Sequence, residues 1–272
     1  MSKRTKVVVF SKDRPMQCLA SIQSLYKHCL HFDHVDVEVL FSTSNDKIFQ
    51  AYLAVENESP IRTAFTKQVN FQEDLLRIVE GYDYTFFVVD DNLFVSDFDV
   101  ADGQKFLEKW SDAIVFSYRM GLNINYCYTV DRPQEIRFFQ IFNDQIKTCW
   151  ETSVLDWNYP MDLSSSMYRT YEIYPYLKYL QYSNPNQLEF YLDNFKSKFY
   201  KPYMGCYQQS VAFCNPVNKV NSINTNRSGK NNEYSIENLL KKFQDGYRIN
   251  IDKFDGFVPN SPHQEVDIEF IK

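Results

Sequence analysis

Glycine is scarce in this sequence, with seven residues in a chain of 272. The turn after the first apolar stretch, Ser11-Lys12-Asp13-Arg14-Pro15, contains none. A dinucleotide-binding turn of the Rossmann type uses glycines so that the backbone can approach a pyrophosphate, and a Walker loop uses Gly-Lys-Ser/Thr. The sequence offers neither pattern at this turn. Side chains such as the Asp13 carboxylate and the Arg14 guanidinium would have to contact a nucleotide directly.

Other absences narrow the class of protein. None of the six cysteines forms a Cys-x-x-Cys pair, and their spacings fit neither a zinc site nor a disulfide framework. No apolar run approaches the roughly 20 residues of a membrane span, and the apolar run 7–10 is too short for a signal-peptide core. The net charge of −6 argues against a nucleic-acid binder with a broad basic surface. We therefore expect a cytoplasmic protein with reduced thiols.

The stretch 85–95, Thr-Phe-Phe-Val-Val-Asp-Asp-Asn-Leu-Phe-Val, is the most informative part of the chain. Its apolar run 86–89 shows no polar alternation, which favours a strand buried on both faces within a parallel sheet. The strand should end before Asp90 and Asp91, because paired carboxylates are costly to bury without a partner. Ligands bind at the carboxyl ends of such strands, and two carboxylates there could hold a divalent cation. The alternative is an acidic turn, where Asp and Asn are common.

Strands and helices alternate along the first part of the chain. We expect strands at 6–10, 35–41, 61–66, 85–89 and 113–118, and helices at about 15–28, 48–55, 71–80 and 101–110. Asn70 and Glu73 have the spacing of a capping box, and Gly81 is a typical helix stop. This order predicts a parallel sheet with helices on its faces.

The alternation weakens after Tyr118, so the second half is predicted in less detail. The 218–232 stretch is rich in Asn, Ser and Lys, which favours a mobile loop. We expect, in chain order, short strands at 126–130 and 136–142, a loop at 156–168, helices at 171–182 and 186–199, an extended stretch at 202–220, a helix from 235 to about 246 and an extended stretch at 256–272.

Two motifs together resemble a known family. Val-Val-Val-Phe-Ser-Lys-Asp-Arg-Pro at 7–15, followed by Phe-Phe-Val-Val-Asp-Asp-Asn at 86–92, is similar to the nucleotide half of GT-A-fold glycosyltransferases, closest to the inverting, family 2-like type. The resemblance implies an α/β fold of GT-A type, with a Rossmann-like, mostly parallel central sheet flanked by helices and a smaller mixed C-terminal half. It implies a nucleotide-sugar-binding half at 1–120 and an acceptor-binding half with a C-terminal extension at 121–272, in one continuous domain.

The resemblance also implies roles for individual residues. Ser11, Asp13 and Arg14 would contact the nucleotide, and Asp90 would face its ribose. Asp91 would carry the Mn²⁺ or Mg²⁺ ion that binds the donor diphosphate. Asn92 stands where many members of the family have a second Asp, which is a departure from the pattern.

Later family features have candidates in the expected order. The stretch 161–168, Met-Asp-Leu-Ser-Ser-Ser-Met-Tyr, would be the donor loop, with serines where glycine is usual. Serine takes a positive φ less cheaply than glycine. His263 would complete the metal shell, since imidazole joins carboxylates more readily around Mn²⁺ than around Mg²⁺; a surface histidine is the alternative. Arg119 could pair with a phosphate or with a carboxylate.

Glu189 is the candidate general base, which would remove the proton of the attacking acceptor hydroxyl. Asp156 and Asp162 are the other candidates for this role. A glutamate near a helix start is also favoured by the helix dipole alone, without any catalytic role.

The function implied is inverting, metal-dependent transfer of a sugar from a nucleotide diphospho-sugar, with UDP-sugar the first choice of donor, to a hydroxyl of a glycan or other acceptor. A lipid-linked acceptor would add peripheral membrane association. A sugar nucleotidyltransferase normally has a Gly-Gly-x-Gly-x-Arg loop after its first strand, which is absent here. The alternative from another class is a non-catalytic GT-A-like module that binds a nucleotide or a protein partner.

Overall fold

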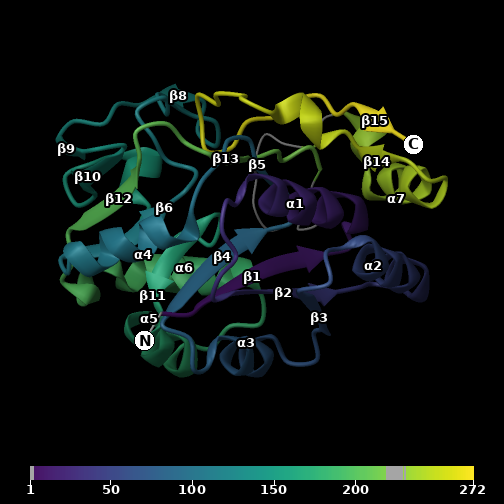
Figure 1. Cartoon of the computed structure of the whole chain (residues 1–272), viewed down its shortest axis with the longest axis horizontal. Coiled ribbons are helices and arrows are strands. Elements are labelled where there is room, and N and C mark those ends of the chain that lie inside the picture. Colours follow the sequence, from purple (N-terminus) through teal and green to yellow (C-terminus); the bar gives the residue numbers. More distant parts are fainter. Residues whose placement is uncertain (1–2, 219–228, 230) are drawn as a thin grey trace.

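The computed structural model describes residues 3–218, 229 and 231–272, and its centre is one large sheet (Figure 1). Within these residues the sheet has nine strands. In spatial order they are β3 (Thr63–Lys67), β2 (Val35–Ser42), β1 (Thr5–Lys12), β4 (Tyr84–Val89), β11 (Ser166–Arg169), β6 (Ala113–Ser117), β12 (Tyr203–Tyr207), β10 (Gln145–Cys149) and β9 (Phe139–Phe142).

The sheet has a parallel part and a part that contains antiparallel strand pairs. The strands β3, β2, β1 and β4 are mutually parallel. Next, β11 runs antiparallel to both β4 and β6, while β12 is parallel to β6 and antiparallel to β10. The α/β fold with a mostly parallel sheet is therefore confirmed. Because β11 and β12 lie beside β4 and β6, both halves of the chain build one sheet. The boundary near residue 120 stays a prediction.

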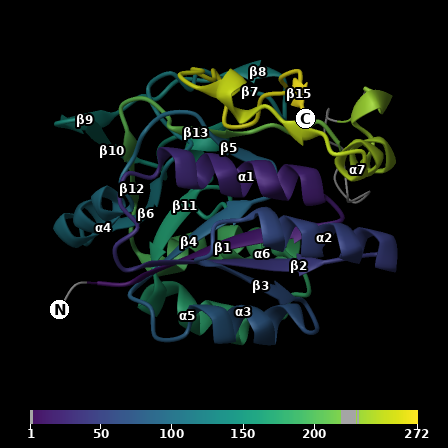
Figure 2. The same cartoon turned by 45° about the vertical axis from the view of Figure 1, so that its right-hand side comes forward.

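Helices cover both faces of the sheet. Figure 2 shows α1 and α2 on one side and α3 and α5 on the other. The described helices are α1 (Pro15–His28), α2 (Asp46–Glu58), α3 (Phe71–Val79), α4 (Val100–Lys109), α5 (Thr170–Tyr179), α6 (Pro185–Phe195) and α7 (Ile236–Gln244), with 3₁₀ turns η1 (Leu155–Asn158), η2 (Lys196–Phe199), η3 (Asn232–Tyr234) and η4 (Ile251–Phe254). None of these helices is long and apolar enough to cross a membrane.

Three small sheets complete the fold, and the first positions the site. It pairs β5 (Asn92–Phe94) with β13 (Ala212–Cys214). The second pairs β14 (Arg248–Ile249) with β15 (Phe270–Ile271) near the C-terminus. The third pairs β7 (Tyr126–Cys127) with β8 (Arg132–Pro133). The β5–β13 pair brings the chain after the acidic motif against a segment more than a hundred residues later.

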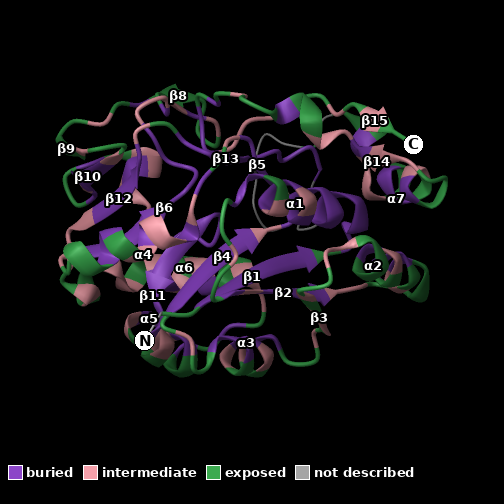
Figure 3. Ribbon diagram, in the orientation of Figure 1, coloured by how far each residue is buried: buried purple, intermediate pink, exposed green. Residues whose placement is uncertain are grey.

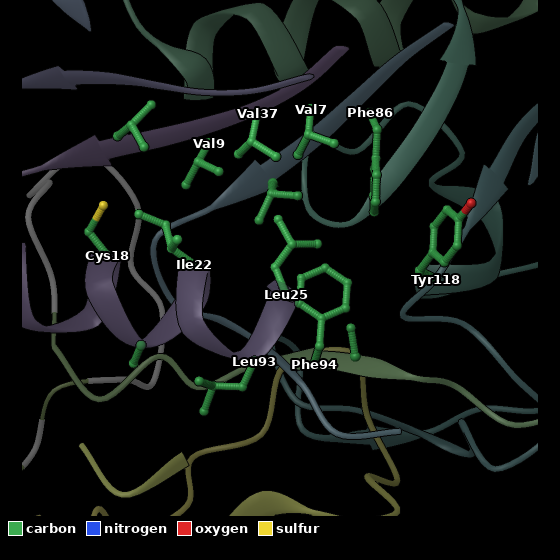
Figure 4. Close-up of a cluster of buried hydrophobic side chains, with 14 of the residues drawn as sticks. Val7, Val9, Cys18, Ile22, Leu25, Val37, Phe86, Leu93, Phe94 and Tyr118 are labelled. Carbon is green, nitrogen blue, oxygen red and sulfur yellow. The ribbon is translucent and has the colours of Figure 1, made fainter. Parts of the chain in front are cut away.

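The core has two parts because the central strands are buried on both faces (Figure 3). Val7 and Val9 of β1 pack under α1, whereas Val8 and Phe10 pack on the opposite face. Figure 4 shows the α1 side, where Cys18, Ile22 and Leu25 meet Val7, Val9 and Val37. This arrangement confirms the two-sided burial that the apolar runs predicted.

Several local predictions are confirmed. Helix α1 begins at Pro15 and ends at His28. Strand β4 ends at Val89, directly before the acidic pair. The Asn70 side chain accepts a hydrogen bond from the backbone N–H of Glu73, so α3 has the expected cap.

The second half differs more from the predictions. The loop expected at 156–168 is wrong at its end, because Ser166–Arg169 forms β11 in the middle of the sheet. Strand β10 was not predicted. The helix expected at 171–182 ends at Tyr179, and the one expected at 186–199 changes to a 3₁₀ turn after Phe195. Of the strand expected at 126–130, only Tyr126–Cys127 is paired. Most of the mobile loop expected at 218–232 lies outside the described residues.

Candidate functional site

The turn after β1 and the acidic motif after β4 meet at one edge of the sheet. The two strands are parallel neighbours, so their carboxyl ends lie side by side. Ser11 Oγ donates to Asp90 Oδ2 at 2.9 Å, and the backbone N–H of Lys12 donates to the same oxygen at 3.2 Å. Arg14 Nη1 donates to Asp90 Oδ1 at 3.0 Å and to Asp91 Oδ2 at 3.3 Å. The structure therefore brings together the two motifs that the sequence singled out.

The acidic pair and its arginine form a buried ionic group. Side chains of Arg14 and Asp90 are less than a tenth exposed, and Asp91 is 15% exposed. Burial alone would lower the pKa of Arg14, but the charges of Asp90 and Asp91 raise it above its usual value. Beside the pair lies a cavity of about 10 Å³, lined in part by Gln17, Asp90, Asp91 and Asn215. This is room for about one water molecule.

Asp13 and Ser11 have further partners that shape the turn. Asp13 has φ of 57°, which is uncommon for a residue other than glycine. Its carboxylate accepts hydrogen bonds from the backbone N–H of Ser44 at 2.7 Å and from Ser44 Oγ at 2.5 Å. Tyr52 hydrogen-bonds Ser11 Oγ through its hydroxyl, which also accepts from the backbone N–H of Arg14 at 3.2 Å. Asp13 thus faces the loop after β2 and holds the turn in place.

Asn92 closes the bend between β4 and β5. Its Oδ1 accepts from the backbone N–H of Val89 at 3.0 Å, and its Nδ2 donates to Cys214 Sγ at 3.2 Å. The side chain is fully buried. The amide oxygen that would bind a metal is therefore already used within the protein.

A second polar cluster, around Arg119, lies next to Cys214, the residue that Asn92 contacts. Arg119 Nε is 3.4 Å from Asp162 Oδ1, and Arg119 Nη1 donates to His263 Nε2 at 3.2 Å. Arg119 thus pairs with a carboxylate, one of the two alternatives that the sequence left open. Burial and the charge of Arg119 lower the pKa of His263 to about 3, so its imidazole is neutral near pH 7.

Glu189 lies near the start of α6 and faces the predicted donor loop. Its carboxylate accepts from Tyr159 Oη at 3.1 Å and from the backbone N–H of Leu163 at 2.8 Å. Burial and the nearby charge of Asp162 raise the pKa of Glu189 to about 7. A carboxylate with a pKa close to neutrality is suited to proton transfer.

The predicted donor loop is held by its own aspartate. Asp162 Oδ1 accepts from the backbone N–H of Ser164 at 2.8 Å and from Ser166 Oγ at 2.9 Å. Ser165 adopts φ of 56°, a conformation that glycine takes at lower cost. Its side chain is fully buried, and its hydroxyl has no hydrogen-bond partner among the described residues.

Replacing Ser165 by glycine should stabilise the protein by about 1 kcal/mol, because glycine removes both the backbone strain and an unsatisfied buried hydroxyl. Urea unfolding would measure the change. Ser165→Ala removes the hydroxyl but keeps the strain, so it should gain less. A loss of stability in Ser165→Gly would show that the serine is not strained.

Asp156, the third carboxylate of the prediction, lies beside this cluster. Its Oδ2 accepts from Gln134 Nε2 at 2.7 Å, and its backbone N–H donates to Gln134 Oε1 at 3.1 Å. Burial raises the pKa of Asp156, and Arg119 opposes this effect. The preceding residue, Leu155, has φ of 55°.

Cys214 connects the two clusters. It pairs with Asn92 across β5 and β13, forms a β-bridge with His263 and lies 3.6 Å from Arg119 Nη1. Sequence reasoning missed Cys214, Ser44 and Gln134, which carry no motif. Tyr52 was predicted only as part of the helix at 48–55, although its hydroxyl hydrogen-bonds Ser11 Oγ and the backbone N–H of Arg14.

The described residues contain no group of three or more His, Cys, Asp or Glu side chains that could hold a metal ion. Among them, Asp91 makes one side-chain hydrogen bond, through Oδ2 to Arg14. Mg²⁺ is commonly bound by one or two carboxylates together with substrate phosphates. The residues present therefore fit a metal that would bind with a diphosphate at Asp91, and not a site made of protein ligands alone.

Comparisons with known proteins agree with this fold. No family model matches the chain. The chain is 28% identical over 190 residues to the bifunctional glycosyltransferase pgtA of Dictyostelium discoideum, covering 62% of this chain. The match spans about a quarter, 24%, of that relative's length.

Among solved structures, S. aureus TarS 1–349 in complex with UDP has a TM-score of 0.50 and 15% identity, covering 75% of this chain and 58% of that chain. The same fragment without a named ligand has a TM-score of 0.50 and 15% identity, covering 78% and 60%. The sequence match to a glycosyltransferase and the fold shared with TarS confirm the resemblance to GT-A glycosyltransferases.

Proposed function

We propose that this chain transfers a sugar from a nucleotide diphospho-sugar to an acceptor hydroxyl, with inversion and with a divalent metal. The observation that carries the proposal is the meeting of the Ser11–Arg14 turn with Asp90 and Asp91 at the carboxyl ends of β1 and β4. Similarity to pgtA, a named glycosyltransferase, supports the reaction class. The UDP bound to TarS supports UDP as the nucleotide of the donor.

The donor would bind along the carboxyl edge of the sheet, with its ribose at Asp90 and its diphosphate near Arg14. Arg14 forms ion pairs with both carboxylates and is available as a bidentate phosphate ligand once it leaves one of them. Ser11 and Asp13 act in this scheme through the shape of the turn, since their side chains bond Asp90, Tyr52 and Ser44.

A metal bound at Asp91, Mn²⁺ or Mg²⁺, would supply positive charge for the leaving diphosphate. Of the three residues considered for it, Asp91 is the one that lines the small cavity beside the acidic pair. Asn92 contacts Cys214, and His263 contacts Arg119. We therefore propose that these two side chains do not bind the metal and instead hold the structure around Asp91.

Glu189 is proposed as the general base. Its pKa of about 7 lets it accept the proton of the acceptor hydroxyl as that oxygen attacks the anomeric carbon. Attack from the face opposite the leaving diphosphate gives inversion. Asp162 positions the donor loop against Glu189 through Ser164 and Ser166, and its charge helps to keep the pKa of Glu189 high.

All six cysteines are free thiols, which supports our proposal of a reducing, cytoplasmic compartment. We propose a glycan or another hydroxyl compound as acceptor. A lipid-linked acceptor would add peripheral contact with a membrane.

Asp91→Ala should abolish the stimulation of activity by Mn²⁺, because it removes the carboxylate that we assign to the metal. Hydrolysis and transfer would be followed with a panel of nucleotide sugars, with and without Mn²⁺, in wild type and variant. Asp33→Ala, which changes an exposed carboxylate, is the control. Equal activity in wild type and Asp91→Ala would remove the metal role.

Calorimetry with UDP distinguishes the enzyme from a non-catalytic module. Arg14 already pairs with both carboxylates, an arrangement that a protein-binding descendant could also keep. Binding of UDP that strengthens with Mn²⁺ supports the transferase. No binding of UDP under either condition favours the interaction module.

A further inference from the structure

A cavity of about 600 Å³ lies at the edge of the second half of the chain, where no role has been assigned. Its size is within the range of pockets that bind small ligands. It is lined by Arg132, Pro133, Gln134, Glu135, Arg137, Val154 and Leu155. The wall therefore comes from β8, from the chain that follows it and from the residues at the start of η1.

The cavity shares a wall with the polar cluster of the proposed active site. Gln134 lines the cavity and makes two hydrogen bonds with Asp156, at 2.7 and 3.1 Å. Leu155, also in the wall, directly precedes Asp156 and has φ of 55°. Backbone strain of this kind in a bulky residue is often found at functional sites. Asp156 in turn feels the charges of Arg119 and Asp162.

The charge of the cavity favours an anion. Two arginines and one glutamate line the cavity. Arg137 Nε lies 3.9 Å from Glu135 Oε1, and both side chains are more than half exposed. Such an exposed ion pair contributes little to the free energy of folding. Arg132 forms no ion pair with any residue that the structure describes. Two guanidinium groups without strong partners suit a phosphate, which they bind in bidentate geometry.

We propose that this cavity is the acceptor subsite and that it takes a hydroxyl acceptor carrying a phosphate group, such as a sugar phosphate or a polyol phosphate. Arg132 and Arg137 bind the phosphate, and the Gln134–Asp156 pair separates this subsite from Glu189 and Asp162. The identification of the cavity as an acceptor subsite rests on the proposed function. The binding site itself is tested without activity.

Binding of glucose 6-phosphate and of glucose would be measured by calorimetry in the presence of saturating UDP and Mn²⁺, which keeps the nucleotide site filled. We expect glucose 6-phosphate to bind at least tenfold more tightly than glucose. The double variant Arg132→Gln/Arg137→Gln should lose this preference and bind UDP as wild type does. Arg77→Gln, which removes an exposed arginine on α3, is the matched control and should keep it. Inorganic phosphate should compete with glucose 6-phosphate in wild type and in Arg77→Gln, but not in the double variant.

Equal binding of glucose 6-phosphate by wild type and the double variant overturns the subsite, even where UDP binds and sugar transfer is observed. An arginine-dependent preference for the phosphorylated sugar supports it. A preference of this kind in a protein that does not bind UDP keeps the anion site and rejects the proposed transferase. The two proposals therefore fail in distinguishable ways.

Discussion

Glu189→Gln is expected to lower kcat by about 10²–10⁴-fold, the usual contribution of a general base. Glutamine keeps the shape of the side chain: its carbonyl oxygen can accept from the backbone N–H of Leu163, and its amide can donate to Tyr159 Oη. It cannot take a proton from the acceptor hydroxyl. The loss should therefore fall on kcat, with KM for the nucleotide sugar nearly unchanged, and steady-state kinetics of transfer would measure both.

The pH dependence should identify the base. With the pKa of Glu189 raised to about 7 by burial and by Asp162, kcat should rise as pH increases through about 7, because the carboxylate becomes deprotonated. Tyr159→Phe removes a hydrogen bond that lowers this pKa, so the rise should move to higher pH. A merely structural role for Glu189 would leave the pH profile of Tyr159→Phe unchanged.

The other two carboxylates serve as comparisons. Asp156→Asn should retain the pH profile, since Asp156 contacts Gln134 and not the donor loop. Asp162→Asn should shift the profile to lower pH, because one of the charges that raise the pKa of Glu189 is lost. If Asp156→Asn lost activity as fully as Glu189→Gln, the assignment of the base would move to Asp156.

The first half of the fold could be predicted because the sequence signals that define its strands and helices are local. An apolar run, a proline at a helix start and an asparagine cap each mark their element without help from distant residues. The meeting of the Arg14 turn with Asp90 also followed, because neighbouring parallel strands end at the same edge of a sheet. Periodicity and capping therefore predicted the elements of this half, and the resemblance to GT-A glycosyltransferases linked the two motifs to one site.

The second half could not be predicted to the same extent because its positions depend on tertiary contacts. Ser166–Arg169 is only four residues long and becomes a central strand through pairing with β4 and β6 on either side. Nothing in the local sequence signals that pairing. The contact of Cys214 with Asn92 joins positions 122 residues apart, and only the folded chain reveals it.

Arg14→Met is expected to lower the free energy of unfolding at pH 7 by about 3–5 kcal/mol, the range found when a buried ion pair loses one partner. Methionine fills part of the volume but leaves Asp90 and Asp91 adjacent and without their cation. Burial already raises the pKa of Asp90, and removal of Arg14 should raise it further. Urea unfolding would measure the loss.

The cause of that loss can be separated from packing. The double variant Arg14→Met/Asp90→Asn removes one of the two carboxylates and should recover most of the stability, because replacing a buried ion pair costs less than breaking it. With the pKa of Asp90 higher in the folded than in the unfolded state, the folded variant binds more protons, so the defect of Arg14→Met should shrink as pH falls from 7 towards 5. A defect that is independent of pH and unchanged in the double variant would mean that Arg14 acts through packing and through the hydrogen bond from its side chain to the backbone carbonyl of Asn218. The acidic pair would then be stable without its ion pair to Arg14, which is the condition for a site that frees Arg14 to bind a diphosphate while a metal binds at Asp91.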